Sequence, residues 1–337
     1  MQKLIIVVDD NFSNLAKAEE VLEKHYRIIT LPSAERLFKI LEKVAPDLIL
    51  LDVMMPEMDG FQAMKLLKEN ELHKKIPVIF LTALNDAVNE ASGIELGAVD
   101  FISKPFSEPV LLNRIKCHLN IDEIIRERTA QLVRLQNSIV NTMANIVESR
   151  DQNTGGHIER TTYYTKVLLE EMLKRKIYME EIIFWDVEQI VSSARLHDLG
   201  KVAISDIILN KPGKLSEEEF KIMKTHALEG TKIIEQMENN ADGESFLHNA
   251  KLVITYHHER WDGTGYPYGL NGTDIPLLGR IMAVVDVYDA LTTERPYKRK
   301  FSSEEAYNII TLESGTHFDP KIVDTFVEIK ERIEAMV

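Results

Sequence analysis

Two residue pairs in the second half of the chain could bind metal ions: His257 with His258, which begin the segment HHERWDGTGYP, and His197 with Asp198. Three further residues of the same types stand in other segments, namely His157, His226 and Asp286. Imidazole and carboxylate ligands without a thiolate suit iron, manganese or zinc. On a helix, adjacent side chains point about 100° apart, so a pair cannot easily hold one ion, although it can serve two ions with Asp198 between them. Two ions about 3.5–4 Å apart are a recurring device for hydrolysing phosphoesters.

A single histidine in a helical segment is usually an ordinary polar residue, and we interpret His248 and His317 in this way. A histidine followed by an aspartate is by itself a weak sign of a metal site. The sign becomes strong only because LHDLGK, KTH and HHERWDGTGYP occur together.

The first half of the chain shows the pattern of a different architecture. Five short apolar runs alternate with segments of helical periodicity, which predicts a doubly wound, flavodoxin-like α/β fold with a five-stranded parallel sheet. The expected strands cover residues 4–8, 27–31, 48–51, 78–81 and 99–102, and the expected helices cover residues 13–24, 34–44, 60–69 and 87–96. Sites in such sheets form at the carboxyl ends of the strands.

Five polar residues stand at those strand ends: Asp9, Asp10, Asp52, Thr82 and Lys104. Three converging carboxylates repel one another, and Mg²⁺, which prefers oxygen ligands, relieves the repulsion. A carboxylate beside Mg²⁺, a lysine and a hydroxyl can act as a nucleophile toward phosphorus. The alternative is that the acidic residues merely form turns, and the presence of all five residues at strand ends disfavours it.

Residues 1 to about 120 resemble the receiver domain of two-component response regulators, through the motifs VVDDN, LDVMMPEMDG, LTAL and ISKPF. The resemblance implies that a cognate sensor histidine kinase supplies the phosphoryl group and that Asp52 is the phosphoacceptor. It also implies roles for six other residues: Mg²⁺ binding by Asp9, Asp10 and the carbonyl of Met54, contacts with the phosphoryl group by Thr82 and Lys104, and a switch role for Phe101. Receivers of this kind hold the bond that corresponds to Lys104–Pro105 in the cis form, and we expect the same here.

Residues 107–150 are expected to form one long connecting helix. The segment contains no glycine, and its proline, Pro109, stands near the start. Apolar residues recur at three- and four-residue steps at Leu132, Leu135, Ile139, Met143 and Ile146. Such a narrow stripe favours a coiled coil with a second copy in a homodimer. The alternative is a lone helix that packs its stripe on the downstream domain.

The remainder of the chain, residues 140–337, is expected to be an all-α domain. Ser216 with Glu219, and Ser302 with Glu305, have the spacing of capping boxes that begin helices. This part resembles the HD-GYP domain, a bacterial class that hydrolyses cyclic di-GMP. The resemblance rests on TGGHIER, LHDLGKVAI, ILNKPGKL, MKTHALEG, HHERWDGTGYP and DVYDALTTERPYK, which follow one another along nearly the whole segment.

The HD-GYP resemblance implies a centre of two transition-metal ions, iron foremost, with manganese or zinc as alternatives. Its ligands would be His157, His197, Asp198 and Asp286 for one ion, and Asp198, His226, His257 and His258 for the other. Lys201 would act with Asp198 in catalysis by reaching the scissile phosphate or the bridging water. The implied substrate contacts are Gly265, Tyr266, Pro267, Arg295 and Lys298, and we expect the glycines to let this loop approach a bulky dinucleotide.

Two features depart from the family pattern. Asn153 stands where some members carry a glutamate that reaches a third metal ion, so we expect a binuclear centre, whether or not Asn153 caps the helix that carries His157. Asp151, six residues before His157, is expected to face elsewhere. The stretch between His157 and His197 is also long, and we expect its extension, KRKIYMEEIIFWDVEQ, to alter a surface helix or an interface.

Composition limits the classes of protein and partner. The 337 residues carry a net charge of −14, and no basic helix-turn-helix is visible, which disfavours nucleic-acid binding. The single cysteine, Cys117, makes an internal disulfide impossible and a zinc–thiolate site improbable. The first apolar run is too short for a signal peptide, and no run reaches the length of a membrane span, so we expect a cytoplasmic protein.

The sequence therefore predicts a response regulator whose phosphorylation at Asp52 controls a metal-dependent phosphodiesterase, acting on cyclic di-GMP to give the linear dinucleotide, GMP or both. Two alternatives stay open. The second half could bind cyclic di-GMP without cleaving it, which the complete ligand set disfavours. It could also hydrolyse another cyclic dinucleotide, such as cyclic GMP-AMP.

Overall fold

The structure is a computed structural model, and it describes residues 2–83, 93–151, 156–239, 245–294 and 300–335. The chain divides into two compact units, Met1–Leu132 and Val133–Val337. One helix, α5 (Glu108–Arg150), spans the boundary between them. Each unit is described separately below.

The first unit contains the expected five-stranded parallel sheet. Its strands are β1 (Leu4–Val8), β2 (Arg27–Leu31), β3 (Leu48–Asp52), β4 (Val78–Ala83) and β5 (Asp100–Lys104). The strand order is β2-β1-β3-β4-β5, and every neighbouring pair is parallel. Its helices before α5 are α1 (Phe12–Leu22), α2 (Ala34–Leu41) and α3 (Gly60–Glu69). The helix expected over residues 87–96 lies largely outside the described residues.

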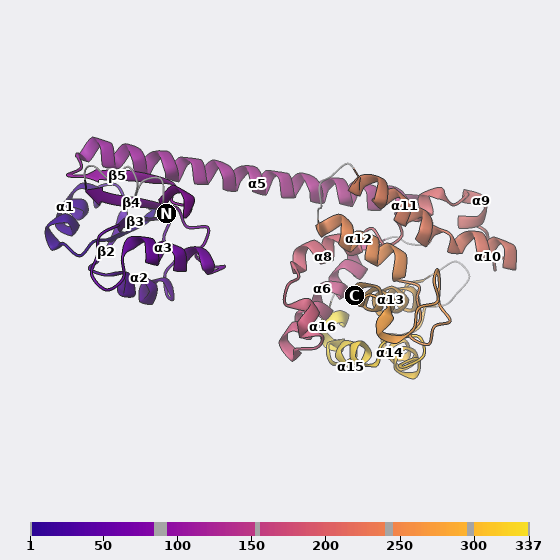
Figure 1. The fold of residues 1–337 in the computed structure, drawn as a ribbon. Helices are drawn as coiled ribbons and strands as arrows, with labels where there is room; N and C mark the ends of the chain where they lie inside the picture. The colour runs from indigo at the N-terminus through magenta and orange to yellow at the C-terminus, as the bar shows by residue number, and fades with distance from the viewer. Residues whose placement is uncertain (1, 84–92, 152–155, 240–244, 295–299, 336–337) are drawn as a thin grey trace. The chain divides into compact units, whose positions relative to one another are not determined.

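Helices cover both faces of this sheet (Figure 1). On one face, Leu15 and Leu22 of α1 and Leu111 of α5 pack against inward-facing strand residues. On the other face, Leu37 of α2 and Met64 of α3 pack against the opposite set. The strands β1 and β3 are buried on both faces, which explains why their sequences are continuous apolar runs without an alternating pattern.

Helix α5 is a single helix of 43 residues, as the absence of glycine predicts. In its second half, which belongs to the second unit, Val140, Ala144 and Val147 are buried, and Val140 and Val147 pack with residues of the other helices of that unit. The apolar stripe behaves differently. Met143 packs partly on the second unit, whereas four stripe residues are 52–67% exposed, namely Leu132, Leu135, Ile139 and Ile146. The helix therefore has two distinct apolar faces. Val140, Ala144 and Val147 form the buried face, whereas most of the stripe forms a second face that is exposed.

The described part of the second unit is helical. Its α-helices are α6 (His157–Arg175), α7 (Met179–Ile182), α8 (Val187–Ala194), α9 (Asp206–Leu209), α10 (Glu217–Lys224), α11 (His226–Glu238), α12 (Ser245–Tyr256), α13 (Leu277–Thr292), α14 (Ser303–Leu312), α15 (Pro320–Glu328) and α16 (Lys330–Glu334). Two 3₁₀ helices, η1 (Leu199–Ala203) and η2 (Gly272–Asp274), stand among them. Both predicted capping boxes are confirmed, at the starts of α10 and α14.

The main core of this unit lies between α6, α13, α14 and α15, with Tyr164, Tyr288 and Phe326 fully buried. The long stretch before His197 belongs to this core in part, because Ile182 and Ile190 are buried within it. Of these two residues, only Ile182 belongs to the extension, whose Ile183 and Phe184 are exposed, so the expected effect on a surface helix or an interface stays a prediction. None of the helices in the described ranges is both long enough and apolar enough to cross a membrane.

Candidate metal centre

Except for Asp286, which lies within α13, the candidate ligands of the second unit stand at or just beyond helix ends. His157 and His226 are the first residues of α6 and α11. The pair His197–Asp198 follows the end of α8, and His257 follows α12, which ends at Tyr256. The helical spacing assumed for the adjacent pairs is therefore wrong. Because His257 and His258 lie beyond their helix, their rings come within 4.0 Å between centroids.

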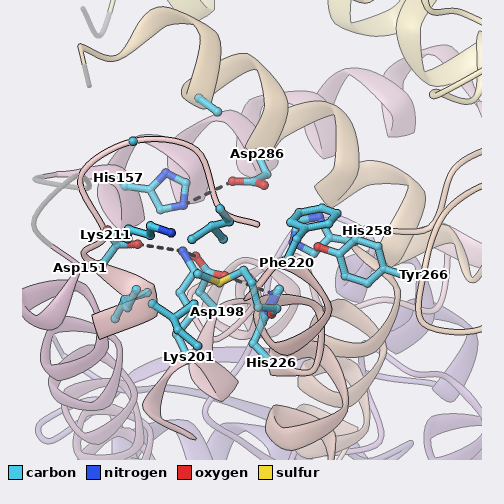
Figure 2. A pocket seen from close by; sticks show the side chains of 16 residues that line it. Asp151, His157, Asp198, Lys201, Lys211, Phe220, His226, His258, Tyr266 and Asp286 are labelled. Atoms are coloured by element: carbon cyan, nitrogen blue, oxygen red, sulfur yellow. Dashed lines mark hydrogen bonds and ion pairs between the residues drawn. The ribbon is translucent and has the colours of Figure 1, made fainter. Parts of the chain in front are cut away.

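These side chains form two groups, each with ligand atoms within 4.8 Å of one another: His157 with His197 and Asp198, and His226 with His257 and His258. Asp198 lies between the groups, with Oδ2 3.4 Å from His197 Nε2 and Oδ1 3.6 Å from His226 Nε2. Asp286, on α13, joins the first group, since its Oδ1 lies 3.5 Å from His157 Nε2. Figure 2 shows His157 and Asp286 on one side of Asp198, and His226 and His258 on the other.

In four of the histidines, the ring nitrogen Nδ1 contacts a residue that is not a candidate ligand. Nδ1 of His197, His226 and His257 faces backbone carbonyls at 2.8–3.1 Å, and His157 Nδ1 faces the Asp289 carboxylate at 2.7 Å. We assign the proton to Nδ1 in each case, which leaves Nε2 as a lone pair that faces the centre.

Those lone pairs face one another at short distances. His157 Nε2 lies 3.0 Å from His197 Nε2, and His226 Nε2 lies 3.3 Å from His257 Nε2. Two lone pairs at this distance repel, and a cation held between them removes the repulsion. The donor set thus fits a divalent ion in each group, with neutral imidazole nitrogens and carboxylate oxygens as ligands.

The charges of the side chains match this fit. Burial, together with neighbouring histidines, lowers the pKa of His257 to about 3 and lowers the pKa of His258. Burial opposes ionisation of Asp198, but Lys201 and His197 outweigh it and hold the Asp198 pKa well below its ordinary value. Neutral histidines and an ionised carboxylate are the forms that bind metal ions, so His257, His258 and Asp198 are prepared for ligation near neutral pH. Burial also opposes the charge on His197, but Asp198 and Asp286 outweigh it and raise the His197 pKa, so a metal ion must displace a proton more readily held there.

Two glycines bring Asp198 next to His226. A Cβ atom on Gly200 would lie 1.8 Å from the carbonyl oxygen of His226, and one on Gly230 would lie 2.9 Å from the backbone nitrogen of Gly200. Glycine at both positions therefore allows η1 to lie directly against α11. The motif LHDLGK carries its glycine for this packing.

A pocket of about 470 Å³ opens over both groups, and its walls include Lys211, Phe220 and Tyr266 (Figure 2). The Tyr266 ring stacks on His258, with 4.7 Å between centroids. Gly265 approaches the chain itself, because a Cβ atom there would lie 2.3 Å from the backbone nitrogen of Arg260. Glycine at position 265 therefore lets the loop pack closely against the backbone of residues 259–260. Pro267 follows Tyr266 in the same loop. Arg295 and Lys298 lie outside the described residues.

The spacing between Asp151 and His157 predicts that Asp151 faces away from the centre. This prediction is wrong, because Asp151 lines the pocket. Its Oδ2 lies 2.9 Å from Lys201 Nζ, which also lies 2.8 Å from Asp198 Oδ2. The helical spacing fails because α5 ends at Arg150, and α6 begins only at His157. The cap of α6 is Gly156, so the alternative that Asn153 caps it is also wrong. Asn153 itself is outside the described residues.

Two buried carboxylates near the centre escaped the sequence reasoning. Asp289 receives hydrogen bonds from Arg160 at 2.6 and 3.0 Å, as well as facing His157. Glu259 accepts the backbone N–H groups of Tyr268, Gly269 and Leu270 and so holds the loop that follows Tyr266. Asp289 stands three residues after Asp286, a helical spacing that could have indicated a common face.

The first unit contains its own acidic cluster, in which Asp9, Asp10 and Asp52 offer oxygens within 4.8 Å of one another. Lys104 Nζ lies 2.6 Å from Asp9 Oδ2 and 2.7 Å from Asp52 Oδ1. The Met54 N–H donates to Asp52 at 3.4 Å. Burial raises the pKa of Asp52, and the Lys104 ammonium opposes that rise. The arrangement fits Mg²⁺, because the single charge of the Lys104 ammonium offsets only part of the charge of three converging carboxylates.

Other residues singled out in the first unit lie around this cluster. Thr82 is buried at the end of β4, and the Lys104–Pro105 bond is cis, as predicted. Phe101 is half-buried and stacks on Phe80, with 5.4 Å between centroids. Asn14 was not predicted, although its Nδ2 donates to both oxygens of Asp9.

Comparisons with known proteins match both units. A response regulator receiver domain model matches residues 5–116, and an HD domain model matches residues 141–322. A "Probable cyclic di-GMP phosphodiesterase" from Vibrio cholerae is 40% identical over 97% of this chain and 77% of its own length. The "Cyclic di-GMP phosphodiesterase response regulator RpfG" from Xanthomonas campestris is 32% identical over 98% of this chain and 88% of its own length. A "3'3'-cGAMP-specific phosphodiesterase 2" from Vibrio cholerae is 36% identical over 63% of this chain and 37% of its own length.

Proposed function

Because this chain belongs to the response regulators that join a receiver domain to an HD-GYP domain, we propose that it hydrolyses cyclic di-GMP at the candidate metal centre. The observation that carries the proposal is the position of Asp198 between two ligand groups on the floor of one pocket. Relatives that span most of this chain are named for cyclic di-GMP. The relative named for cyclic GMP-AMP matches a smaller share of it, so cyclic GMP-AMP remains the second candidate substrate.

We propose that the first ion is held by His157, His197, Asp198 and Asp286, and the second by Asp198, His226, His257 and His258. Two divalent ions held there, iron foremost, with manganese or zinc as alternatives, would supply a Lewis acid for a phosphate oxygen and a water of lowered pKa. The side chains around them orient the substrate. Lys201 presents its ammonium to the same space and stabilises the negative charge that develops on the phosphate.

The rim of the pocket supplies the contacts for the dinucleotide. Tyr266 and Phe220 present aromatic rings on which a guanine base can stack, and Gly265 and Pro267 flank Tyr266 in its loop. Lys211 offers an ammonium group to a phosphate, although the Glu219 carboxylate, with Oε2 2.6 Å from Lys211 Nζ, offsets part of its charge. We also assign Arg295 and Lys298 to phosphate or guanine contacts, on the motif alone.

The proposal is tested by anaerobic incubation of iron-loaded protein with cyclic di-GMP and, separately, with cyclic GMP-AMP, followed by chromatography of the products. The expected result is the linear dinucleotide, GMP or both from cyclic di-GMP, at a higher rate than from cyclic GMP-AMP. Tight binding of cyclic di-GMP without any product would instead establish a sensor. Faster cleavage of cyclic GMP-AMP would transfer the assignment to that substrate.

We also propose that Asp52 accepts a phosphoryl group from a sensor histidine kinase, with Mg²⁺ bound by Asp9, Asp10 and the Met54 carbonyl. Acetyl phosphate with Mg²⁺ is expected to add one phosphoryl group to the wild-type chain and none to Asp52→Asn, because the amide is a poor nucleophile. Intact-mass spectrometry measures the difference. Asp59→Asn, a change at the cap of α3, is the matched control and is expected to be labelled. Equal labelling of Asp52→Asn and the wild type would place the phosphoacceptor elsewhere.

The exposed stripe of α5 supports a homodimer through a coiled coil. Sedimentation analysis is expected to find a dimer of the wild type and a monomer of the double variant Leu135→Glu, Ile139→Glu, since both side chains are more than half exposed and carboxylates would be forced together at the seam. Ser138→Glu adds a charge at a position beside the stripe and is expected to remain dimeric. A monomeric wild type, or a dimeric double variant, would contradict the coiled coil.

A binuclear centre is expected, with two metal ions and no third. Asn153 offers only a neutral carbonyl oxygen, which is a weaker ligand than a glutamate, and the carboxylate of Asp151 is paired with Lys201. Diffraction data collected at the metal absorption edge are expected to show two anomalous peaks between α6, α11 and α13. Three strong peaks within about 4 Å of one another would show that another residue supplies an anionic ligand.

A further inference from the structure

The last turn of α5 reaches the candidate metal centre directly. Glu148 Oε1 accepts the backbone N–H of His157, the first residue of α6, at 2.8 Å. Arg150 is the last residue of the helix, and Asp151 follows it with its carboxylate 2.9 Å from Lys201 Nζ. Three residues within four positions therefore contact the segments that carry His157 and Lys201.

Arg150 fixes the end of the helix to the loop after Lys201. Its guanidinium donates to the carbonyl oxygens of Val202 at 2.8 Å and Ile204 at 3.0 Å, and to the Asp206 carboxylate at 2.7 Å. In return, Asn210 Nδ2 donates to the carbonyl oxygen of Arg150 at 2.8 Å. A planar guanidinium with several fixed acceptors holds its orientation better than a single contact does.

Lys201 lies between two carboxylates that come from different elements. Asp198 belongs to the proposed metal centre, and Asp151 directly follows the connecting helix. Asp151 and Lys201 both lie in the pocket wall, and Asp151 is buried. A long, flexible lysine held by one carboxylate can swing about it, whereas a second carboxylate on the other side fixes the position of the ammonium.

We infer that Asp151 is a positioning residue for Lys201, and that Arg150 and Glu148 hold the end of the connecting helix in the place where Asp151 can do this. The inference rests on the proposed function and deepens it, because it makes the connecting helix part of the catalytic domain's active structure. A shift of this helix end would move Asp151 and thereby the ammonium of Lys201. The metal ligands of the α11 and α12 segments need not move.

Asp151→Asn tests the inference because it keeps the shape of the side chain and removes its charge. We expect kcat for cyclic di-GMP to fall about 10- to 100-fold, the range typical of residues that orient catalytic groups, with KM changed less than about twofold. The metal content is expected to stay near that of the wild type. Asp122→Asn, which breaks an ion pair with Arg126 on the same helix, is the matched control, and its kcat should equal that of the wild type.

A double-mutant cycle separates positioning from a general structural effect. If Asp151 acts through Lys201, Asp151→Asn introduced into Lys201→Met should cause no further loss of kcat. Full additivity of the two losses, or an unchanged kcat in the single variant, would overturn the inference, and so would a loss of metal from Asp151→Asn. An inactive wild type would overturn the proposed function, and the inference with it, whereas an active wild type with an equally active Asp151→Asn overturns the inference alone.

Discussion

Replacing Asp198 by alanine is expected to remove both metal ions and to lower the rate of cyclic di-GMP hydrolysis by at least about a thousandfold. Each oxygen of this carboxylate faces a different ligand group, His197 at 3.4 Å and His226 at 3.6 Å. The change thus takes one ligand from each proposed ion at once. It also leaves Asp151 as the only described carboxylate paired with Lys201, so the Lys201 ammonium would repel any cation entering either ion site.

Elemental analysis and the rate measured on the same sample check this prediction. The control is Asp324→Ala, which removes an exposed carboxylate from α15 and should keep both metal and rate. A variant at Asp198 that retains two ions per chain would show that Asp198 is not shared. A variant that loses metal but keeps the wild-type rate would show that the metal ions take no part in the reaction.

Lys201→Met is expected to produce the opposite combination, with metal retained and kcat lowered about 100- to 1,000-fold, the cost typical of one lost charge-stabilising donor. Methionine keeps the unbranched apolar stem of lysine and removes the ammonium. Because Asp198 and Asp151 both lie within 2.9 Å of Lys201 Nζ, the ammonium is held at the pocket floor, where charge develops on the phosphate. No proposed metal ligand is removed.

The matched control is Lys232→Met, since Lys232 is exposed on α11 and pairs with Glu229. Its kcat is expected to equal that of the wild type. Rates and metal content are measured together, as for Asp198. Undiminished turnover by Lys201→Met would exclude the ammonium from the reaction, and a loss of metal would make Lys201 a structural partner of Asp198.

The elements of the first unit can be predicted closely because their patterns are local. The strands β1 and β3 are continuous apolar runs, and such runs are characteristic of a strand that is buried on both faces. The carboxyl end of a parallel strand is then fixed by topology, which is why Asp9, Asp52 and Lys104 can be grouped from the order of the amino acids alone. The length of α5 is predictable for a similar reason, since nothing between Pro109 and Arg150 interrupts a helix.

The prediction is wrong where it extends helical spacing past a helix end. A separation of six positions predicts that Asp151 faces away from His157, yet α5 ends between them and α6 begins at His157. The separation of His257 and His258 likewise assumes a helix that in fact ends at Tyr256. Residue types and motifs select the candidate ligands, but the ends of helices determine where most of these side chains point.

The contacts of Glu148, Arg150 and Glu259 with the backbone cannot be predicted from spacing. Arg150 binds carbonyl oxygens, and Glu259 binds three N–H groups of a loop. Every residue carries a backbone carbonyl, and every residue except proline carries a backbone N–H, so residue types give no sign of which ones are chosen. Those partners are determined by how closely the chain segments approach one another, as where Gly265 lets its loop pack against Glu259.

The central claim is that the second unit holds two metal ions that act together on cyclic di-GMP. It is tested most directly by titrating metal-free protein with ferrous iron under anaerobic conditions while the rate of hydrolysis is measured. The rate is expected to stay low as the first equivalent binds, to rise as the second binds, and to level off at about two ions per chain. A rate that is already maximal at one ion per chain, or that is unchanged in metal-free protein, would contradict the account.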